Sequence, residues 1–371
     1  MICKRIGLRD FRNVESCRVE LCEGINLLCG QNAQGKTNLL EAVFYASVGR
    51  SFRGANTAEM IRFGAQSAQI CLDYHAGGRD QNLTFRLFRD RRRVAEKNHV
   101  RVEKLSELVG GFRSVLFCPE HLSLIKAGPS ERRSYMDLAL SELYPMYMHA
   151  LQSYHTILKQ RNALIKSAPY DRATFDGTVE LWSRKLAHEA AIIAEARLAY
   201  VRRASGHIAT CFADMTGERE TPTLVYDGSA GGKEELYEDR KRTEETYFSL
   251  LMSSHEREIA AGATLWGIHK DDLDIRLNGK SARIYASQGQ QRSLALSMKL
   301  AEGEICREEF GDYPVFLLDD VLSELDGARR EYLLSRILGK QVLITTCETE
   351  GLSLLKAGKR ILVESGSYKE G

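Results

Sequence analysis

The sequence predicts an α/β protein in which both ends of the chain build one domain and the middle forms an inserted helical domain. Short apolar runs separated by turn residues, typical of strands, fill residues 1–120 and return after about residue 264. In between, over residues 121–263, apolar residues recur every three or four positions, as on a helix. A chain of 371 residues is long enough for two or three domains with cores of their own.

The first part of the chain is expected to alternate strands with one clear helix. Apolar runs bounded by turn residues predict strands at 25–30, 69–74 and 83–88. A helix is predicted over 38–49, because its apolar residues share one face, and Gly49 is placed to end it.

The middle of the chain predicts two long helices that pack side by side. Tyr147 and the apolar residues after it recur at spacings of four, three and four, and a second stripe runs from Trp182 to Tyr200. The turn-rich connector at 167–177 would let these helices run antiparallel. The spacing by itself favours a helical core over a cofactor site. The polar stretch at 227–246 is expected to be a mobile surface segment.

The last part of the chain returns to strands. Asn278-Gly279 predicts the turn of a hairpin. The runs at 315–320 and 341–346 are continuously apolar, as in buried strands of a parallel sheet.

Composition excludes several protein classes. The 52 Lys and Arg residues nearly balance the 50 Asp and Glu residues, so the net charge of +2 does not indicate a nucleic-acid partner. Nine cysteines without a C-x-x-C pair argue against a zinc site and a disulfide framework. The charged N-terminus does not resemble a secretory signal, and no apolar run is long enough to span a membrane. A cytoplasmic, soluble protein is expected.

One motif indicates phosphate binding. The pattern G-x-x-x-x-G-K-[ST] lies between a predicted strand and a predicted helix, which is the context that a nucleotide-binding loop requires. Lys36 would reach the β- and γ-phosphates of ATP, and the Thr37 hydroxyl would bind Mg²⁺. A glycine-rich turn without a ligand is the alternative. The motif residues are Gly30, Gln31, Asn32, Ala33, Gln34, Gly35, Lys36 and Thr37.

An acidic pair ends the apolar strand at 315–320. In a parallel sheet this strand end would place Asp319 near Thr37, where it would complete the Mg²⁺ shell. Asp320 points to another side and is assigned to polarise the attacking water. The alternative is that the pair only caps the helix that follows.

A second candidate anion site opens the helix after residue 287. Because the loop at 30–37 already serves the nucleotide, residues Ser287, Gln288, Gly289 and Gln290 are assigned to ATP held by a second copy of the chain. Ser323 and Asp326 would touch the partner near the same site. ATP would then hold an ATP-dependent homodimer together. The alternative is an N-capped helix start that faces the core.

This ordered set of motifs resembles the ABC-type ATPases of the SMC-like branch, and within it the RecF family. The segments that match this family's pattern are 10–13, 24–42, 49–53, 116–137, 287–302 and 317–326.

The resemblance implies an ABC-type P-loop ATPase head of mixed sheets with helices, with a short inserted helical arm. It implies slow, Mg²⁺-dependent ATP hydrolysis without nuclease activity, and ATP contacts from Arg12, Asn13 and Asn38. Proteins of the family bind duplex DNA near single-strand gaps, interact with RecR, and act with RecO to help load RecA in repair and replication restart.

The chain departs from the family's pattern at several positions. The turn at 267–273 has Ile268 and Lys270 where the family has proline and arginine. Cys347 stands about where many ABC ATPases keep a histidine that senses the γ-phosphate. Cys118 stands near the place of a metal-linked glutamine.

Basic residues supply candidate DNA contacts. A cluster at a predicted hairpin tip and a pair at the start of the helical insert could meet phosphates, although a solvated basic hairpin is the alternative. No recognition-helix motif is present, so binding would be independent of sequence and sensitive to salt. The candidates are Arg89, Arg91, Arg92, Arg93, Arg132 and Arg133.

Two other functions share the nucleotide motifs. The ATPase subunit of a transporter would dock on a membrane partner and usually keeps the glutamine and histidine that are replaced here. The ATPase of a nuclease-coupled system would require an additional acidic metal cluster. The helical insert favours the DNA-repair ATPase over both.

Overall fold

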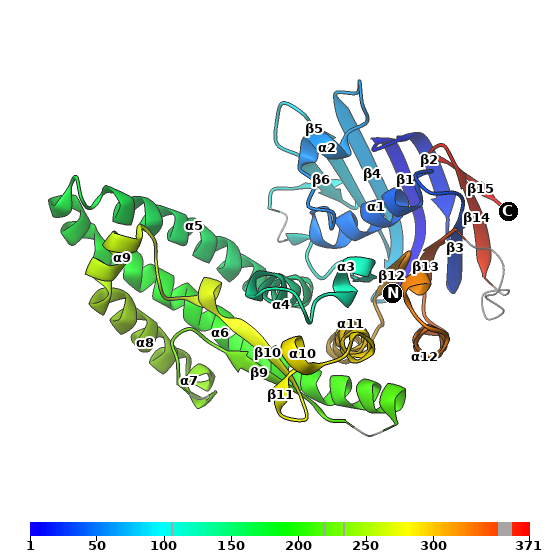
Figure 1. Cartoon of the computed structure of the whole chain (residues 1–371). Coiled ribbons are helices and arrows are strands. Elements are labelled where there is room, and N and C mark those ends of the chain that lie inside the picture. Colours follow the sequence, from blue (N-terminus) through cyan, green and yellow to red (C-terminus); the bar gives the residue numbers. More distant parts are fainter. Residues whose placement is uncertain (105–106, 218–219, 233, 348–357) are drawn as a thin grey trace. The chain divides into compact units, whose positions relative to one another are not determined.

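The structure is a computed structural model that describes residues 1–104, 107–217, 220–232, 234–347 and 358–371 (Figure 1). Residue 233 of the polar stretch and residues 348–350, which follow the predicted strand at 341–346, lie outside the described residues. The chain divides into two compact units. The first comprises Met1–Ser123, Cys211–Gly217 and Arg292–Gly371, and the second comprises Leu124–Thr210 and Glu218–Gln291.

The first unit contains two six-stranded sheets, of which the first is antiparallel throughout. Its strand order is β2-β1-β4-β5-β6-β7. The strands are β1 (Ile2–Phe11), β2 (Val14–Glu20), β4 (Ser67–Ala76), β5 (Arg79–Phe88), β6 (Val94–Lys97) and β7 (Val100–Val102).

The second sheet of this unit is parallel except at one edge, where β15 runs antiparallel to β14. Its strand order is β15-β14-β3-β13-β12-β8. The strands are β3 (Ile25–Cys29), β8 (Ser114–Phe117), β12 (Val315–Asp319), β13 (Val342–Thr346), β14 (Lys359–Glu364) and β15 (Ser367–Glu370). The predicted strands at 25–30, 315–320 and 341–346 are therefore central strands of one sheet.

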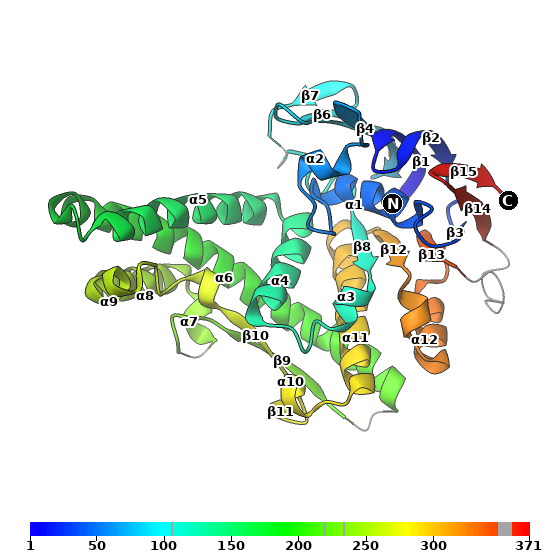
Figure 2. The same cartoon turned by 45° about the horizontal axis from the view of Figure 1, so that its top comes forward.

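Helix α1 (Lys36–Val48) contacts strands of both sheets and lies between them in Figures 1 and 2. Most of its 13 residues are buried, as expected for a helix covered on both sides. Gly49 follows it in the left-handed conformation at φ 69°, and its N–H donates to the carbonyl of Tyr45. The helix thus ends where the glycine predicts.

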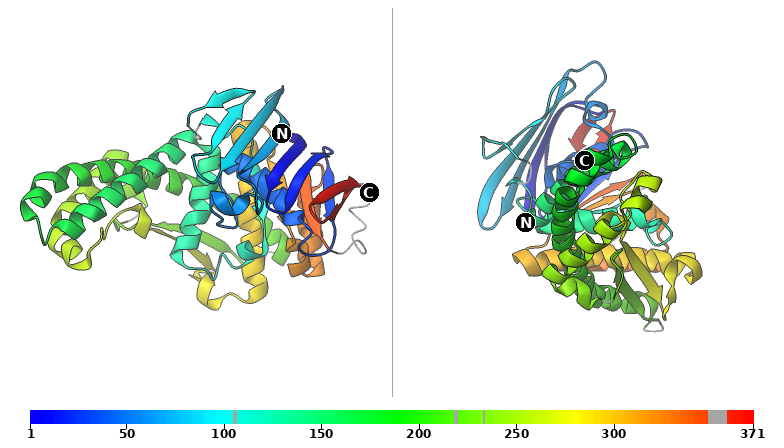
Figure 3. Two further views of the ribbon diagram at one scale, coloured as in Figure 1. Left: turned by 90° about the horizontal axis from the view of Figure 1, so that it is seen from above. Right: turned by 90° about the vertical axis from the view of Figure 1, so that its left-hand side faces the viewer.

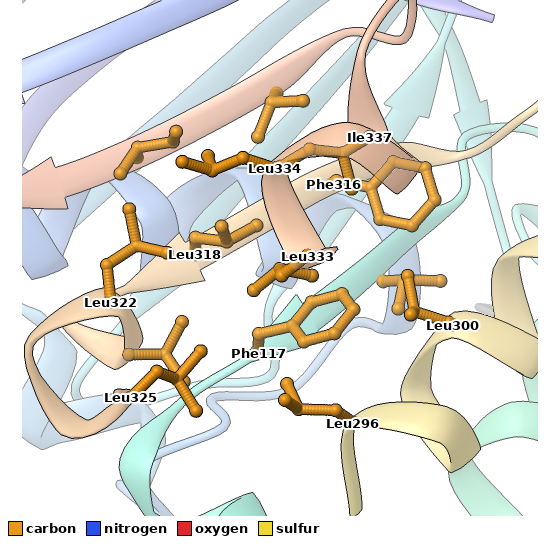
Figure 4. Packing of buried hydrophobic residues seen from close by; sticks show 14 of the residues in the cluster. Phe117, Leu296, Leu300, Phe316, Leu318, Leu322, Leu325, Leu333, Leu334 and Ile337 are labelled. Carbon is orange, nitrogen blue, oxygen red and sulfur yellow. The ribbon is translucent and has the colours of Figure 1, made fainter. Parts of the chain in front are cut away.

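Short helices and one long helix complete the unit. A core cluster that includes Phe117, Leu296 and Phe316 fills the space between the parallel sheet and the helices that follow it (Figure 4). The helices are α2 (Thr57–Met60), α3 (Pro119–Leu122), the 3₁₀ turn η3 (Val321–Glu324), α12 (Gly327–Ile337) and α11 (Gln288–Phe310), whose first residues belong to the second unit.

The second unit is mainly helical, and its two longest helices lie side by side in the green part of Figure 3. Hydrogen bonds join Arg161 to Ser183 at 3.1 Å and Arg197 to Tyr147 at 3.2 Å, so the later residue on one helix meets the earlier one on the other. The helices therefore run antiparallel. They are α5 (Pro145–Ser167) and α6 (Arg172–Thr216), and the others are α4 (Pro129–Leu143), α7 (Glu235–Glu238), α8 (Arg240–Ser253), α9 (His255–Ala261) and α10 (Ala282–Tyr285).

A small antiparallel sheet in the order β11-β10-β9 also belongs to the second unit. Its strands are β9 (Pro222–Asp227), β10 (Asp272–Leu277) and β11 (Lys280–Ser281), and the 3₁₀ turn η2 (Ile268–Lys270) precedes β10. Asn278 and Gly279 both have positive φ and join β10 to β11 in the predicted hairpin.

Two expectations differ from this arrangement. Residues 264–291, expected in the domain built from the chain ends, lie in the second unit because β10 pairs with β9. The stretch at 227–246 is not simply a polar surface segment. It includes α7 and part of α8, and Tyr237 within it is 1% exposed. The Tyr237 ring packs so closely on Gly228 that a Cβ there would lie 2.2 Å from it.

Candidate nucleotide site

The predicted phosphate-binding loop leads from β3 into α1. Gly35 precedes the helix at φ 115°, a conformation that favours glycine, and no side chain caps the first turn. Gly30 passes so close to β14 that a Cβ would lie 2.3 Å from the carbonyl oxygen of Val363. Both glycines of the motif are therefore required by the backbone path, and the first amides of α1 stay uncapped by side chains.

Lys36 lies inside this loop with 7% of its surface exposed. Its ammonium group donates to the carbonyl of Gly30, to that of Gln31 at 3.1 Å and to the Cys347 sulfur at 3.1 Å. The Cys347 thiol also donates to the Asn32 side-chain oxygen at 2.8 Å. A cation surrounded by weak or neutral acceptors is suited to receive a phosphate oxygen, which is a far stronger acceptor.

Thr37 and Asp319 meet as the parallel strands predict. The Thr37 hydroxyl donates to Asp319 Oδ1 at 2.8 Å, and the Thr345 hydroxyl donates to the same oxygen at 2.9 Å. Burial raises the pKa of Asp319, and the hydrogen bond from Thr37 opposes this shift. A hydroxyl and a carboxylate in contact form part of an oxygen shell of the kind that Mg²⁺ prefers.

Asp320 follows in the left-handed conformation at φ 50°. Its N–H donates to the Thr345 hydroxyl at 2.9 Å, and the Ser323 hydroxyl donates to its carbonyl oxygen at 2.6 Å. Asp320 lines the cavity next to the loop, so its carboxylate is placed to accept a proton from a group bound there.

The cavity has a volume of about 860 Å³. Besides the loop, its lining includes Asn38, Arg53, Thr345, the 98% exposed Phe63, and Arg89, which was predicted as a DNA contact. Its size is in the range of small-molecule sites. The sequence analysis did not assign Arg53, Phe63 or Thr345 to this site, because no motif marks their side chains as nucleotide contacts.

Arg12 and Asn13 also line this cavity. The Arg12 guanidinium donates to both oxygens of the buried Glu41, at 2.8 and 2.6 Å. Asn13 accepts from the Asn38 amide at 2.7 Å and donates to the Gln34 carbonyl at 3.3 Å. The structure thus brings most of the sequence-predicted nucleotide residues of the first unit to one cavity, whereas Gly30, Gln31, Gln34 and Asp319 lie outside its lining.

The residues fit a magnesium ion that the nucleotide helps to hold. Thr37 and Asp319 supply two oxygen ligands, and among the described residues no group of three or more His, Cys, Asp or Glu could hold a metal without further ligands. Mg²⁺ usually keeps several waters and binds through one or two protein oxygens together with substrate phosphates. The two oxygen ligands from Thr37 and Asp319 match this mode of binding.

The second predicted anion site opens α11. The Ser287 hydroxyl accepts from the Gln290 N–H at 3.3 Å, and the Gln290 side chain accepts from the Ser287 N–H at 2.6 Å. This reciprocal pair is a capping box. Ser287 and Gln288 are exposed, whereas the Gln290 amide also donates to Glu220.

Ser323 and Asp326, assigned to the partner contact, have local roles in the structure. Asp326 caps α12 by accepting from the Arg329 N–H at 3.0 Å. Its carboxylate also pairs with the Arg329 guanidinium. Ser323 remains exposed next to Asp320.

The candidate DNA contacts separate into two groups. Arg91 and Arg92 are exposed at the connection between β5 and β6, and Arg91 stacks over the Phe88 ring at 3.8 Å. Arg89 donates to the Ala65 carbonyl at 2.8 Å, and Arg93 donates to the Tyr45 hydroxyl at 2.8 Å. The first two guanidinium groups are better placed for phosphates than the second two.

The basic pair at the start of the helical insert makes hydrogen bonds within the second unit. Arg132 is 5% exposed and donates to both oxygens of Asp272, at 2.8 and 2.7 Å. Arg133 donates to the Asp271 carbonyl at 2.7 Å. Burial and pairing of Arg132 argue against a phosphate contact, which the sequence could not indicate because Asp272 lies 140 residues away.

Cys347 and Cys118, which replace residues of the ABC ATPase pattern, differ in their surroundings. Cys347 is exposed and contacts Lys36, as described above. Cys118 is buried, and burial raises its pKa to about 12, so this thiol is neutral at physiological pH. It lies at the end of β8, directly before α3.

The described residues contain no helix that is both long enough and apolar enough to cross a membrane.

Comparison with known proteins identifies relatives that match nearly the whole chain. The family model described as the RecF/RecN/SMC N-terminal domain matches residues 2–368. A protein of Ruminiclostridium cellulolyticum named DNA replication and repair protein RecF is 37% identical, with 94% of each chain covered. The protein of the same name from Bacillus pumilus is 35% identical, with 99% of each chain covered.

Solved structures agree with these relatives. A structure of the recombination mediator protein RecF with ATP, from the RecFOR pathway, has a TM-score of 0.92 and 33% identity, and the match covers 100% of this chain and 97% of that one. The Smc head domain of Pyrococcus furiosus bound to a ScpA domain has a TM-score of 0.55 at 17% identity, covering 99% of this chain and 95% of that one. The second likeness concerns the fold alone.

Proposed function

The chain belongs to the RecF family, and from this premise we propose that it is an ATP-dependent, DNA-binding ATPase of DNA replication and repair. The observation that carries the proposal is the joint placement of Lys36 and Thr37, at the end of a loop whose glycines are required by the backbone, with Asp319 at the end of β12. The relatives named for DNA replication and repair match nearly the whole chain, which supports the same activity here.

In this proposal the nucleotide phosphates lie against the start of α1. The loop amides and the Lys36 ammonium bind the phosphate oxygens, and their positive charge opposes the negative charge that grows during transfer of the γ-phosphate. Arg12, Asn13 and Asn38 line the cavity beside the loop. When bound, Mg²⁺ would supply further charge neutralisation from the Thr37–Asp319 pair.

Hydrolysis requires a base for the attacking water. We assign this role to Asp320, whose carboxylate lines the cavity beside the loop. Asp319 is unsuited to it because its Oδ1 already accepts from Thr37 and Thr345. Neighbouring carboxylates would thus divide metal binding and proton transfer between them.

A second copy of the chain would complete the site. The exposed Ser287 and Gln288, with Gly289 and Gln290, would meet the γ-phosphate held by the partner, and Ser323 and Asp326 would lie at the same interface. ATP would then drive formation of a homodimer, and slow hydrolysis would release it. The experiment for this step is sedimentation with ATP and with ADP: dimers are expected with ATP alone.

DNA would be bound through its backbone. Arg91 and Arg92 are the leading contacts because they are exposed, with Arg89 and Arg93 next to them. The preferred DNA would be duplex next to single-strand gaps, and RecR, RecO and RecA would be the protein partners in the cytoplasm. Affinity should fall as salt rises, with a slope of roughly one unit in log–log terms for each phosphate contact.

The deciding measurement is steady-state ATP hydrolysis at several protein concentrations, with and without linear duplex DNA. We expect a slow rate that rises more steeply than first order in protein and increases with DNA. A rate that is linear in protein and indifferent to DNA would overturn the proposal of a DNA-bound dimer. No release of nucleotides from the DNA is expected in the same reactions.

A further inference from the structure

The hairpin β14–β15 makes hydrogen bonds to the phosphate-binding loop. β14 pairs in parallel with β3, so it runs beside the strand that leads into the loop. Beyond that pairing, Ser365 and Gly366 turn the chain with φ values of 47° and 78°. This combination of positive φ values at both turn positions is that of a two-residue hairpin turn. The hairpin turn therefore lies next to the phosphate-binding loop.

Four hydrogen-bond donors of the hairpin reach the loop at two consecutive residues. The Gly366 N–H donates to the Gln34 carbonyl at 2.9 Å, and the Ser365 N–H donates to the Gln34 side-chain oxygen at 2.6 Å. The Tyr368 hydroxyl donates to the Gly35 carbonyl at 2.8 Å. The Ser365 hydroxyl also donates to the Gln34 side-chain oxygen, at 3.4 Å. All four donors act on acceptors of the loop, and none occupies one of its amides.

This pattern has a direct consequence for the loop amides. A peptide group is planar and trans, so its carbonyl and the N–H of the next residue point in opposite directions. The hairpin holds the Gln34 carbonyl, and together with the Asn38 and Leu39 N–H groups of α1 it holds the Gly35 carbonyl. The N–H groups of Gly35 and Lys36 are therefore directed away from these donors. These two residues line the nucleotide cavity.

The fit between hairpin and loop leaves little room for movement. A Cβ on Gly366 would lie 2.7 Å from the carbonyl oxygen of Asn13, and a Cβ on Gly35 would lie 3.0 Å from the Asn13 side chain. Asn13 also donates to the Gln34 carbonyl. The turn after β1 and the hairpin turn thus pack against each other, and both hold the Gln34 carbonyl of the loop.

We propose that Tyr368 and the Ser365–Gly366 turn are positioning residues for nucleotide binding, which aim the phosphate-binding amides of Gly35 and Lys36 from outside the site. They touch no substrate themselves. The inference rests on the proposed binding of ATP by this loop. It assigns part of the affinity for the phosphates to a hairpin that lies more than 300 residues from the loop in sequence.

The first test is Tyr368→Phe, which keeps the ring and removes the hydroxyl. One hydrogen bond to a loop carbonyl is lost, and we expect the Kd for ATP and for ADP to rise about 3- to 10-fold. The KM for ATP should rise by a similar factor while kcat changes less than about twofold, because the amides bind the phosphates before and during transfer.

The matched control is Tyr313→Phe. Tyr313 is also a partly buried tyrosine of the first unit, and its hydroxyl donates to Glu304 at 2.9 Å, away from the cavity lining. Its loss should leave the Kd unchanged. A second variant, Gly366→Ala, places a Cβ against Asn13 at positive φ and should raise the Kd more than Tyr368→Phe. Urea unfolding of each variant separates lost binding from lost folding.

The outcomes are distinguishable. A wild-type chain that binds no ATP would overturn the proposed function and this inference together. Wild-type binding with an unchanged Kd in Tyr368→Phe would overturn this inference alone. An equal loss of affinity in Tyr313→Phe, or a fall in kcat with KM unchanged, would equally contradict a role in aiming the loop.

Discussion

The starts of α1 and α11 are both predicted to bind anions, but their first amides have different partners. α1 begins after Gly35 without any side-chain cap. α11 begins with a reciprocal pair in which Ser287 and Gln290 satisfy each other's N–H groups. The unpaired amides of a helix start need partners, and a bound anion is one of them. The first amides of α1 are therefore available to a bound anion. At the start of α11 the amide of Gln290 is already paired, so a ligand would meet mainly exposed side chains there.

The largest effect is expected beside the α1 site, in Asp320→Asn. The amide cannot accept the proton of the attacking water, so kcat should fall by about 10² to 10⁴. ATP binding should persist, and the ATP-bound dimer should accumulate in sedimentation experiments. If the variant keeps its turnover, another group must be the base, and Asp320 has no catalytic role at the α1 site.

Lys36→Ala should weaken ATP binding by about 100-fold, because a buried charge-assisted contact with the phosphates is lost. Equilibrium binding of a fluorescent ATP analogue measures this change. In the proposal, the start of α11 contacts only the nucleotide of the partner copy, so it cannot replace the lost Lys36 charge. Affinity close to the wild-type value would show that the α1 amides are sufficient alone.

Ser287→Arg should leave ATP binding by the separate chain intact and weaken ATP-dependent dimerisation by about tenfold or more, because a bulky side chain replaces a small one at the interface. Light scattering in the presence of ATP reports the dimer. Normal dimerisation would remove the assignment of α11 to the partner's nucleotide and leave it as a capped helix only.

The smallest effect is expected in Ser287→Ala, which removes the acceptor for the Gln290 N–H. The free energy of unfolding should fall by about 1 kcal/mol, the usual contribution of an N-cap. Ser287→Asn restores a capping side chain and should recover most of the loss in urea unfolding. Equal stability of all three chains would mean that the capping box contributes little.

Local motifs made much of the nucleotide site predictable. The strand–loop–helix context of Gly30–Thr37 and the parallel strands that bring Asp319 to Thr37 follow from patterns of a few residues. The contacts from Tyr368 to Gly35 and from Arg132 to Asp272 could not be found in this way. Each joins residues far apart in sequence, and neither a hydrophobic period nor a motif marks such a pair.

The same limit applies to the division of the chain. The hairpin at Asn278-Gly279 is evident from its sequence, but its placement in the second unit depends on the pairing of β10 with β9. The run before Asn278 alternates its residues as a strand should, whichever sheet it joins. A strand pattern thus predicts the element without its partner.

The position of β3 in its sheet also bears on how the chain is made. Both of its neighbours, β13 and β14, come late in the sequence, and Asn26 contacts Val342 across a separation of 316 residues. At a synthesis rate of about 5–20 residues per second, β3 would wait roughly 15 to 60 s on the ribosome for a partner. The antiparallel helices α5 and α6 pair over much shorter separations and have no such delay. We expect nascent chains to acquire protease-resistant helices before the nucleotide-binding sheet exists, with the apolar β3 dependent on chaperones in the interval.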